Sequence, residues 1–473
     1  MDDKLRKEKE LFVSNLNGTT WQEIDCLQLM QPLCVILLSS FMSFMCQGVK
    51  FPAPHLCITT LRYATDFALS VLPLLAALTV FVEYAAVFAQ VLIVCVILLL
   101  AVTCNNYRKV SWKDLWNRQM NCDYISWYRA YVNLLTAICI LAVDFKVYPR
   151  RLAKTETFGT GLMDIFVGAF IMCNSLVCKE ARDPSLEFSC AREKLSSVKK
   201  VLTSSLPLTI LGVARLTVTK SSNYQGHVSE YGVHWNFFMT LAATRIICTL
   251  LLTLLKPSKA LFLGLSFAAT YQYLLSAGLQ RYILRDGGRN ESFVSANREG
   301  IFSLFGYMSL YFIGVTIGQV IFQQKRSSVS AHVRLGVVLL VISVGSLLAQ
   351  MAAESYGMHT SRRVANLPFI LWTVHHSLLV VAAMLAVAAV SRSLELMFTV
   401  NISSHKSEIL ESINYNGLLY FLLANLLTGG VNLLINTLQC SNAQALLVLA
   451  TYLLALNTVI YIFYLFRIKT KFW

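Results

Sequence analysis

Apolar runs close to the length of a membrane-spanning helix recur from residue 28 to residue 466. A helix that crosses a bilayer needs about 20 mostly apolar residues. The chain is also 56% hydrophobic and only 14% charged, which lies outside the range of soluble globular proteins. The sequence therefore predicts an all-α, polytopic membrane protein with about thirteen transmembrane helices. The expected spans lie near residues 28–47, 67–83, 85–104, 128–143, 160–178, 201–218, 236–255, 260–279, 301–322, 335–354, 367–390, 415–437 and 444–466.

These spans define one multi-span domain at 28–466, between an N-terminal segment at 1–27 and a tail at 467–473. An odd number of spans places the two ends on opposite sides, and Lys and Arg are more frequent in the loops on the side of the C-terminus. Because cytosolic loops are enriched in these residues, we expect the N-terminus in the lumen and the tail in the cytosol. Lys469 and Lys471 look like a dilysine signal for retrieval to the endoplasmic reticulum, although basic residues that simply follow a last span have the same pattern.

Sequons for N-linked glycosylation begin at Asn17, Asn290 and Asn401. The first two fall in segments expected in the lumen, whereas Asn401 falls on the cytosolic side. We therefore predict a glycan at Asn17.

A charge-rich segment at 144–164 separates the fourth and fifth expected spans. Charges beside hydrocarbon cost free energy and persist where function or topology requires them. Asp144 follows an apolar run, where burial and nearby cations act in opposite directions on its affinity for a proton, as in a general base. Pro149 ends the preceding helix and lets Lys154 fold back towards Asp144. We expect Asp144 to be the catalytic base and Lys154 its cationic partner; the alternative is a buried ion pair that only closes the loop.

A second polar group, His234 and Asn236, lies among aromatic residues at the start of the seventh expected span. Histidine is the usual proton shuttle near neutral pH, so His234 is a second candidate base. A belt of aromatic and polar residues at the membrane surface is the alternative. His375 and His376 lie inside an expected span without acidic neighbours along the chain, and this pattern favours a packing role.

Several basic residues on the expected lumenal side run against the positive-inside rule, which suggests an anionic ligand such as a phosphate. Contact with lipid head groups is the alternative. Asp164, Asn297 and Asn366 stand where expected spans begin, so each is either a substrate ligand or a residue that starts a helix. The predicted substrate-binding residues are Arg150, Arg151, Asp164, Asn236, Asn297, Arg298, Arg362, Arg363 and Asn366.

Several kinds of functional motif do not occur in the sequence. It has no Cys or His spacing typical of a metal site, no P-loop and no Gly-x-Ser-x-Gly turn. We therefore expect no metal, kinase, ATP-driven pump or serine hydrolase. Its basic residues lie in short runs between apolar segments, which argues against nucleic-acid binding. Two classes of function remain: an integral-membrane enzyme that acts on a lipid, and a carrier.

Dispersed motifs resemble those of a known family. They are the segments 12–19, 141–145, 148–156, 230–238 and 297–300 and the terminal Phe472 and Trp473. On these motifs the chain, from residue 12 to its C-terminus, resembles the glycosylphosphatidylinositol inositol-acyltransferase family of the PIG-W type. The resemblance implies transfer of a fatty acyl group, typically palmitoyl from palmitoyl-CoA, to the inositol ring of glucosaminyl-phosphatidylinositol. It also implies a membrane protein of the endoplasmic reticulum with its motifs towards the lumen.

For such a reaction the residues suggest direct transfer, because no Ser or Cys stands out as a nucleophile. Asp144 would take the hydroxyl proton and Lys154 would stabilise the oxyanion or the thiolate, with acyl-CoA as co-substrate and no further cofactor. Two alternatives remain open. One is a transporter or flippase for an anionic lipid or metabolite, and the other is a membrane acyltransferase built around a His and an Asn, for which His234 would be essential.

Overall fold

The computed structural model describes residues 12, 14, 16–46, 55–104, 111–185, 190–221, 228–398 and 406–470. Within these residues the chain is helical, and its β structure is limited to isolated bridges, which pair Gly18 with Thr160 and Gln119 with Ser328. This arrangement confirms the predicted all-α class. Asn401 and Lys471 lie outside the described residues.

In the described residues, 11 helices are long and apolar enough to cross a membrane. All thirteen expected apolar runs coincide with helix, and the two that are not among the 11 lie in the shorter apolar helix Leu162–Ser175 and in α10 (Ala191–Ser221). The expected number of about thirteen spans is therefore approximate. The 11 spans are Trp21–Met45, Thr59–Leu78, Val82–Val102, Asp123–Ala142, Phe237–Leu255, Pro257–Leu284, Arg298–Gln323, Val329–Ser355, Leu367–Glu395, Gly417–Leu434 and Asn442–Leu465.

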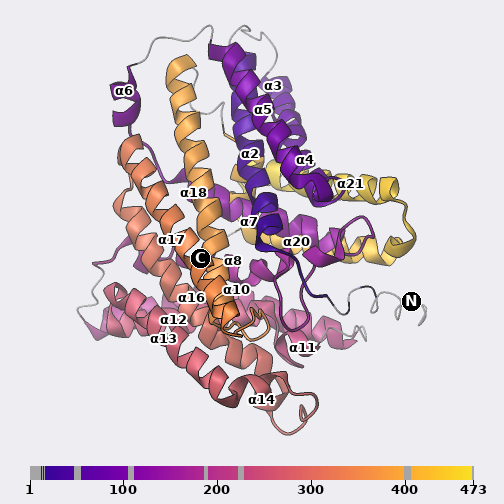
Figure 1. Cartoon of the computed structure of the whole chain (residues 1–473), viewed down its shortest axis with the longest axis vertical. Coiled ribbons are helices and arrows are strands. Elements are labelled where there is room, and N and C mark those ends of the chain that lie inside the picture. The colour runs from indigo at the N-terminus through magenta and orange to yellow at the C-terminus, as the bar shows by residue number, and fades with distance from the viewer. Residues whose placement is uncertain are drawn as a thin grey trace.

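The helices are arranged around a centre (Figure 1) that is filled with buried apolar side chains. α7 lies at this centre, with most of its residues buried, and α17 and α18 run side by side. α5 lies at the periphery and exposes apolar side chains such as Val87 and Leu98, as expected of a surface that faces lipid. The helices are α2 (Trp21–Cys46), α3 (His55–Asp66), α4 (Leu72–Leu78), α5 (Ala85–Cys104), α6 (Trp112–Asn117), α7 (Asp123–Ala142), α8 (Ile165–Ser175), α9 (Lys179–Arg182), α10 (Ala191–Ser221), α11 (Val228–Tyr231), α12 (Phe237–Leu255), α13 (Ala260–Leu274), α14 (Gln280–Leu284), α15 (Phe293–Ala296), α16 (Arg298–Gln323), α17 (Val329–Ser355), α18 (Leu367–Phe398), α19 (Glu408–Tyr415), α20 (Gly417–Leu434) and α21 (Asn442–Leu465).

Glycines on α16 allow other segments to approach its backbone closely. A Cβ atom at Gly306 would lie 2.0 Å from the carbonyl oxygen of Ala365, and one at Gly318 would lie 2.5 Å from that of Leu176. Small residues serve this purpose where helices pack in membranes. Gly306 thus sets the segment before α18 directly against α16.

Backbone hydrogen bonds join several loops at the end of the bundle where α2, α8, α12, α16 and α18 begin. The amide of Gly159 donates to the carbonyl of Thr360 over 2.9 Å, and the amide of Val233 donates to that of Ala296 over 3.0 Å. The amide of Thr19 donates to Thr160 over 2.7 Å. We call segments 16–25, 143–164, 228–236, 285–299 and 355–366 together the loop layer. It contains most of the residues that the sequence singles out.

Candidate functional site

Glu230 connects two cations in the loop layer. Lys154 Nζ lies 3.0 Å from Glu230 Oε1, and Arg362 Nη2 lies 3.3 Å from the same oxygen. Arg362 also donates through Nε to Asp164 Oδ1 over 2.7 Å. The chain Lys154, Glu230, Arg362, Asp164 therefore links three loops that are distant in sequence.

Glu230 and Arg362 stabilise each other's ionised form. Burial alone would raise the pKa of Glu230, but Lys154 and Arg362 outweigh that effect and lower it to about 2. Burial alone would lower the pKa of Arg362, yet the carboxylates of Glu230 and Asp164 raise it above its usual value. Both groups are therefore ionised at neutral pH, and the ammonium group of Lys154 faces a permanent negative charge.

Asp164 is fully buried and organises the turn before α8. Its carboxylate accepts hydrogen bonds from the backbone amides of Thr155 and Gly161, each over 3.0 Å. Gly161 lies so near Ala153 that a Cβ atom there would be 2.1 Å from a carbonyl oxygen. These contacts match the expected role of Asp164 at a helix start, and its contact with a substrate stays a prediction.

Asp144 has a different partner from Lys154. Asn432 of α20 donates through Nδ2 to Asp144 Oδ2 over 2.6 Å. In the described part of the chain Lys154 forms its ion pair with Glu230, and none joins it to Asp144. The expected approach of Lys154 to Asp144 is therefore not seen among the described contacts, and Lys154 instead forms an ion pair that joins two loops. Their joint action on a substrate stays a prediction.

Arg150 and Arg151 turn in different directions. Arg150 donates to the carbonyl oxygens of Phe145 and Tyr148 in its own loop, and burial lowers its pKa to about 10. Arg151 Nη2 lies 2.8 Å from the carboxylates of both Glu23 and Glu83. Arg151 therefore ties the loop layer to α2 and to the turn before α5, and phosphate binding by either arginine stays a prediction.

Arg298 and Glu299 stabilise segment 285–299. Arg298 is fully buried and donates to the carbonyl oxygens of Ile283, Gly287 and Arg285. Since these acceptors occupy its guanidinium group, the phosphate contact that the sequence suggested would require it to change partners.

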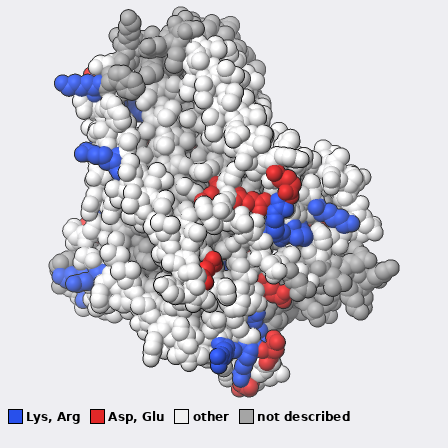
Figure 2. All heavy atoms as spheres, viewed as in Figure 1, with Lys and Arg blue, Asp and Glu red and all other residues white. Residues whose placement is uncertain are grey.

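The buried carboxylate of Glu299 joins this segment to the one before α18. Glu299 Oε1 lies 2.6 Å from Arg289 Nη2 and 2.9 Å from Arg363 Nη2. Arg363, like Arg362, is thus held by a carboxylate from another loop. Figure 2 shows acidic and basic side chains adjoining on a face that is otherwise largely uncharged.

Asn297 positions His234. Its Oδ1 accepts the backbone amide of His234 over 2.7 Å, and the His234 ring stacks parallel to that of Phe293 at 6.4 Å. His234 therefore lies in the loop layer, beside the segment that carries Glu230. A role as base stays a prediction.

Asn236 and Asn366 cap helices. Asn236 Oδ1 accepts the amide of Met239 at the start of α12, and Asn366 Oδ1 accepts the amide of Phe369 at the start of α18. Both contacts are those of helix N-caps. For Asn366 the structure supports the helix-start alternative, and for Asn236 it shows a capping role that the sequence reasoning did not consider. Substrate binding by either residue stays a prediction.

Asn17 and Asn290 are both exposed. Gly18, which follows Asn17, has a φ of 82° and pairs with Thr160 of the loop layer. Asn17 therefore lies at the surface beside segment 143–164, and its glycosylation stays a prediction.

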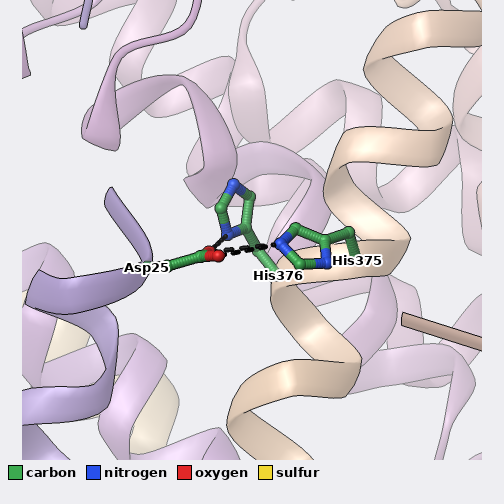
Figure 3. Close-up of side chains that lie close together, drawn as sticks. All are labelled: Asp25, His375 and His376. Carbon is green, nitrogen blue, oxygen red and sulfur yellow. Dashed lines mark hydrogen bonds and ion pairs between the residues drawn. The ribbon is translucent and has the colours of Figure 1, made fainter. Parts of the chain in front are cut away.

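His375 and His376 do have an acidic neighbour, which corrects the expectation of a packing role. Asp25 of α2 approaches both rings: Asp25 Oδ2 lies 3.1 Å from His375 Nε2, and Asp25 Oδ1 lies 2.8 Å from His376 Nδ1 (Figure 3). Asp25 is 350 residues away in sequence. Inspection of neighbours along the chain could not find this contact.

Other residues of the site also escaped the sequence reasoning. Glu230 and Glu299 lie in the motif segments 230–238 and 297–300. A charged residue in a segment that also holds a predicted residue, His234 or Arg298, was the signal that could have identified them. Asn432 is an amide inside an apolar run, and the local sequence gave no signal for its contact with Asp144.

The fold and these contacts define a polytopic helical membrane protein with an ion-paired polar site at one end of its bundle. The family model GWT1 matches residues 5–463. The chain therefore belongs to the GWT1 family, which confirms the resemblance seen in its motifs.

Curated relatives match along nearly their whole length. A human protein named glucosaminyl-phosphatidylinositol-acyltransferase PIGW is 33% identical over 99% of each chain. The phosphatidylinositol-glycan biosynthesis class W protein of Dictyostelium discoideum is 32% identical over 100% of each chain. The GPI-anchored wall transfer protein 1 of Candida albicans is 31% identical over 96% of each.

Proposed function

We propose that this chain transfers a fatty acyl group, palmitoyl from palmitoyl-CoA, to the inositol ring of glucosaminyl-phosphatidylinositol. The observation that carries the proposal is its similarity, over 99% of both chains, to relatives named for acyl transfer to this lipid. The reaction is a step of GPI-anchor biosynthesis, and we place it in the membrane of the endoplasmic reticulum with the N-terminus in the lumen and the C-terminus in the cytosol.

In the proposed mechanism Asp144 accepts the proton of an inositol hydroxyl group. The hydroxyl oxygen attacks the carbonyl carbon of the thioester, and the intermediate then breaks its carbon–sulfur bond and releases CoA as the thiolate. Lys154 stabilises the oxyanion or the leaving thiolate. The transfer is direct, and no acyl-enzyme forms.

The described contacts suggest how the chain prepares these groups. Asn432 orients the carboxylate of Asp144, and Glu230 restricts the position of the Lys154 ammonium group. In many enzymes, fixed charges and dipoles aimed at a developing negative charge supply most of the rate acceleration. His234 is the second candidate base, and the arginines of the loop layer are candidates for the phosphates of the lipid or of CoA.

The test uses purified full-length protein with palmitoyl-CoA and glucosaminyl-phosphatidylinositol, and mass spectrometry of the lipid product. A gain of one palmitoyl group is expected. If the lipid stays unmodified but crosses the bilayer of liposomes, the protein is a flippase and the proposal fails. A labelled acyl adduct on the protein would replace direct transfer by an acyl-enzyme.

Two variants test the catalytic pair. Asp144→Asn and Lys154→Met should each abolish acylation in folded protein. Matched controls are Asp123→Asn and Lys406→Met, which break an ion pair of 2.7 Å outside the loop layer. Loss of activity in His234→Ala with full activity in Asp144→Asn would instead assign the reaction to the His-dependent class.

A further inference from the structure

The group Asp25, His375 and His376 has the composition and geometry of a metal site. One ligand atom from each residue lies within 4.8 Å of those from the other two. Two atoms bound tetrahedrally to one zinc ion at about 2.0–2.1 Å lie about 3.4 Å apart, so small side-chain rotations would suffice. Two imidazoles with one carboxylate are a recurrent ligand set for divalent transition ions.

The contacts of His375 favour a lone pair directed at Asp25. Its Nδ1 lies 3.1 Å from the backbone carbonyl oxygen of Ser343, which can only accept a hydrogen bond. The hydroxyl group of Ser343 donates to the carbonyl of His375. The Ser343 hydroxyl also lies 2.9 Å from Nδ1. In the tautomer whose Nδ1 donates to the Ser343 carbonyl, Nε2 of the neutral ring faces the Asp25 carboxylate with its lone pair. Metal-binding histidines characteristically donate their other N–H to such a carbonyl.

His376 supplies an independent observation. Its ring is fully buried, and its Nε2 has no hydrogen-bond partner among the described residues. Its Nδ1 nevertheless lies 2.8 Å from Asp25 Oδ1 (Figure 3). Nδ1 can therefore either donate a proton to Asp25 or, through its lone pair, share a cation with that carboxylate.

We propose that Asp25, His375 and His376 bind one divalent transition-metal ion, zinc by the nature of the ligands. The ion ties α2 to α18 at the edge of the loop layer, to which Asp25 belongs. It takes three protein ligands and leaves at least one position for water or another ligand. This site is separate from Asp144 and Lys154 and does not depend on the proposed acyl transfer.

The test is the metal content of purified full-length protein, exposed to zinc chloride alone, desalted and measured by mass spectrometry of the elements. Wild-type protein should retain about one zinc ion per chain, and zinc should raise its melting temperature. The Asp25→Asn and His376→Gln variants should lose both effects. The control is His332→Gln, a change at another fully buried histidine that bonds to Ser328, which should leave both effects intact.

The proposal fails if wild-type protein retains no more zinc than the His376→Gln variant, because a shared proton then suffices to join the three side chains. If the variants do not fold, cobalt chloride with wild-type protein decides the matter. Visible absorption bands of bound cobalt support the site, and their absence overturns it.

Discussion

Lys154 Nζ lies 3.0 Å from Glu230 Oε1, across 76 residues of sequence. An ammonium group from the loop after α7 is thus held by a carboxylate from the short helix before α12. Arg362 reaches the same carboxylate from the segment before α18. Glu230 is therefore the residue through which the loops that carry the candidate site constrain one another.

The first prediction concerns Glu230 as a positioning residue. Glu230→Gln keeps the shape of the side chain but removes the charge that holds Lys154. We expect acyl transfer to fall by about 10- to 100-fold, mainly in kcat, because a misplaced catalytic group costs this much. Asp123→Asn, which breaks the ion pair with Lys406, should retain activity. Wild-type kcat in Glu230→Gln would show that Lys154 needs no anchor.

The second prediction concerns pH. The pKa of Glu230 is about 2 in the fold against an ordinary 4.5, so its stabilising contribution is complete above pH 4.5 and is lost as the pH falls towards 2. Melting temperatures of wild type and Glu230→Gln should therefore differ most at pH 6 and converge only as the pH falls from about 4 towards 2. The control Glu291→Gln, at an exposed ion pair with Arg285, should change little at any of these pH values. A constant gap between wild type and Glu230→Gln would contradict the assignment.

The third prediction concerns the close approach of α16 to the segment before α18. In Gly306→Ala the new Cβ atom would lie 2.0 Å from the carbonyl of Ala365, so the segment that carries Arg362 must shift. We expect a loss of about 1–3 kcal/mol in stability, seen as a lower melting temperature. Gly345→Ala is the control because nothing lies within 4 Å of that position. Equal melting temperatures for the two variants would rule out this contact.

The sequence predicted the helical class and the loops of the site because both depend on local signals. Apolar runs identify spans, and charges between them stand out, as for Lys154, Asp164 and Arg362. Partners could not be predicted, since they depend on packing between distant segments. Lys154 is nearer in sequence to Asp144 than to Glu230, yet it pairs with Glu230. Asp25 and His375 are 350 residues apart, so the sequence around either residue does not indicate their contact.

The fourth prediction concerns the two contacts of Arg362. Its Nε binds Asp164 and its Nη2 binds Glu230, which requires the fork of a guanidinium group. In Arg362→Lys a single ammonium group has to leave one carboxylate without its partner. We expect a lower melting temperature and reduced acyl transfer. Arg334→Lys, at an exposed position on α17, should leave both measurements unchanged. Full activity and stability in Arg362→Lys would show that the bridge is dispensable.

The last prediction concerns Asn432, which donates to Asp144 Oδ2 over 2.6 Å. If Asp144 is the base, loss of this amide removes a hydrogen bond that favours the charged form of the carboxylate. Asn432→Leu should therefore lower kcat about ten-fold and shift the acidic limb of the pH–rate profile, with little change in KM for palmitoyl-CoA. Asn425→Leu is the matched control, because Asn425 lies on the same helix and its amide bonds only to the carbonyl of Phe421 among the described contacts. A lower kcat without a shifted profile would assign Asn432 a purely structural role and would remove it from the proposed mechanism.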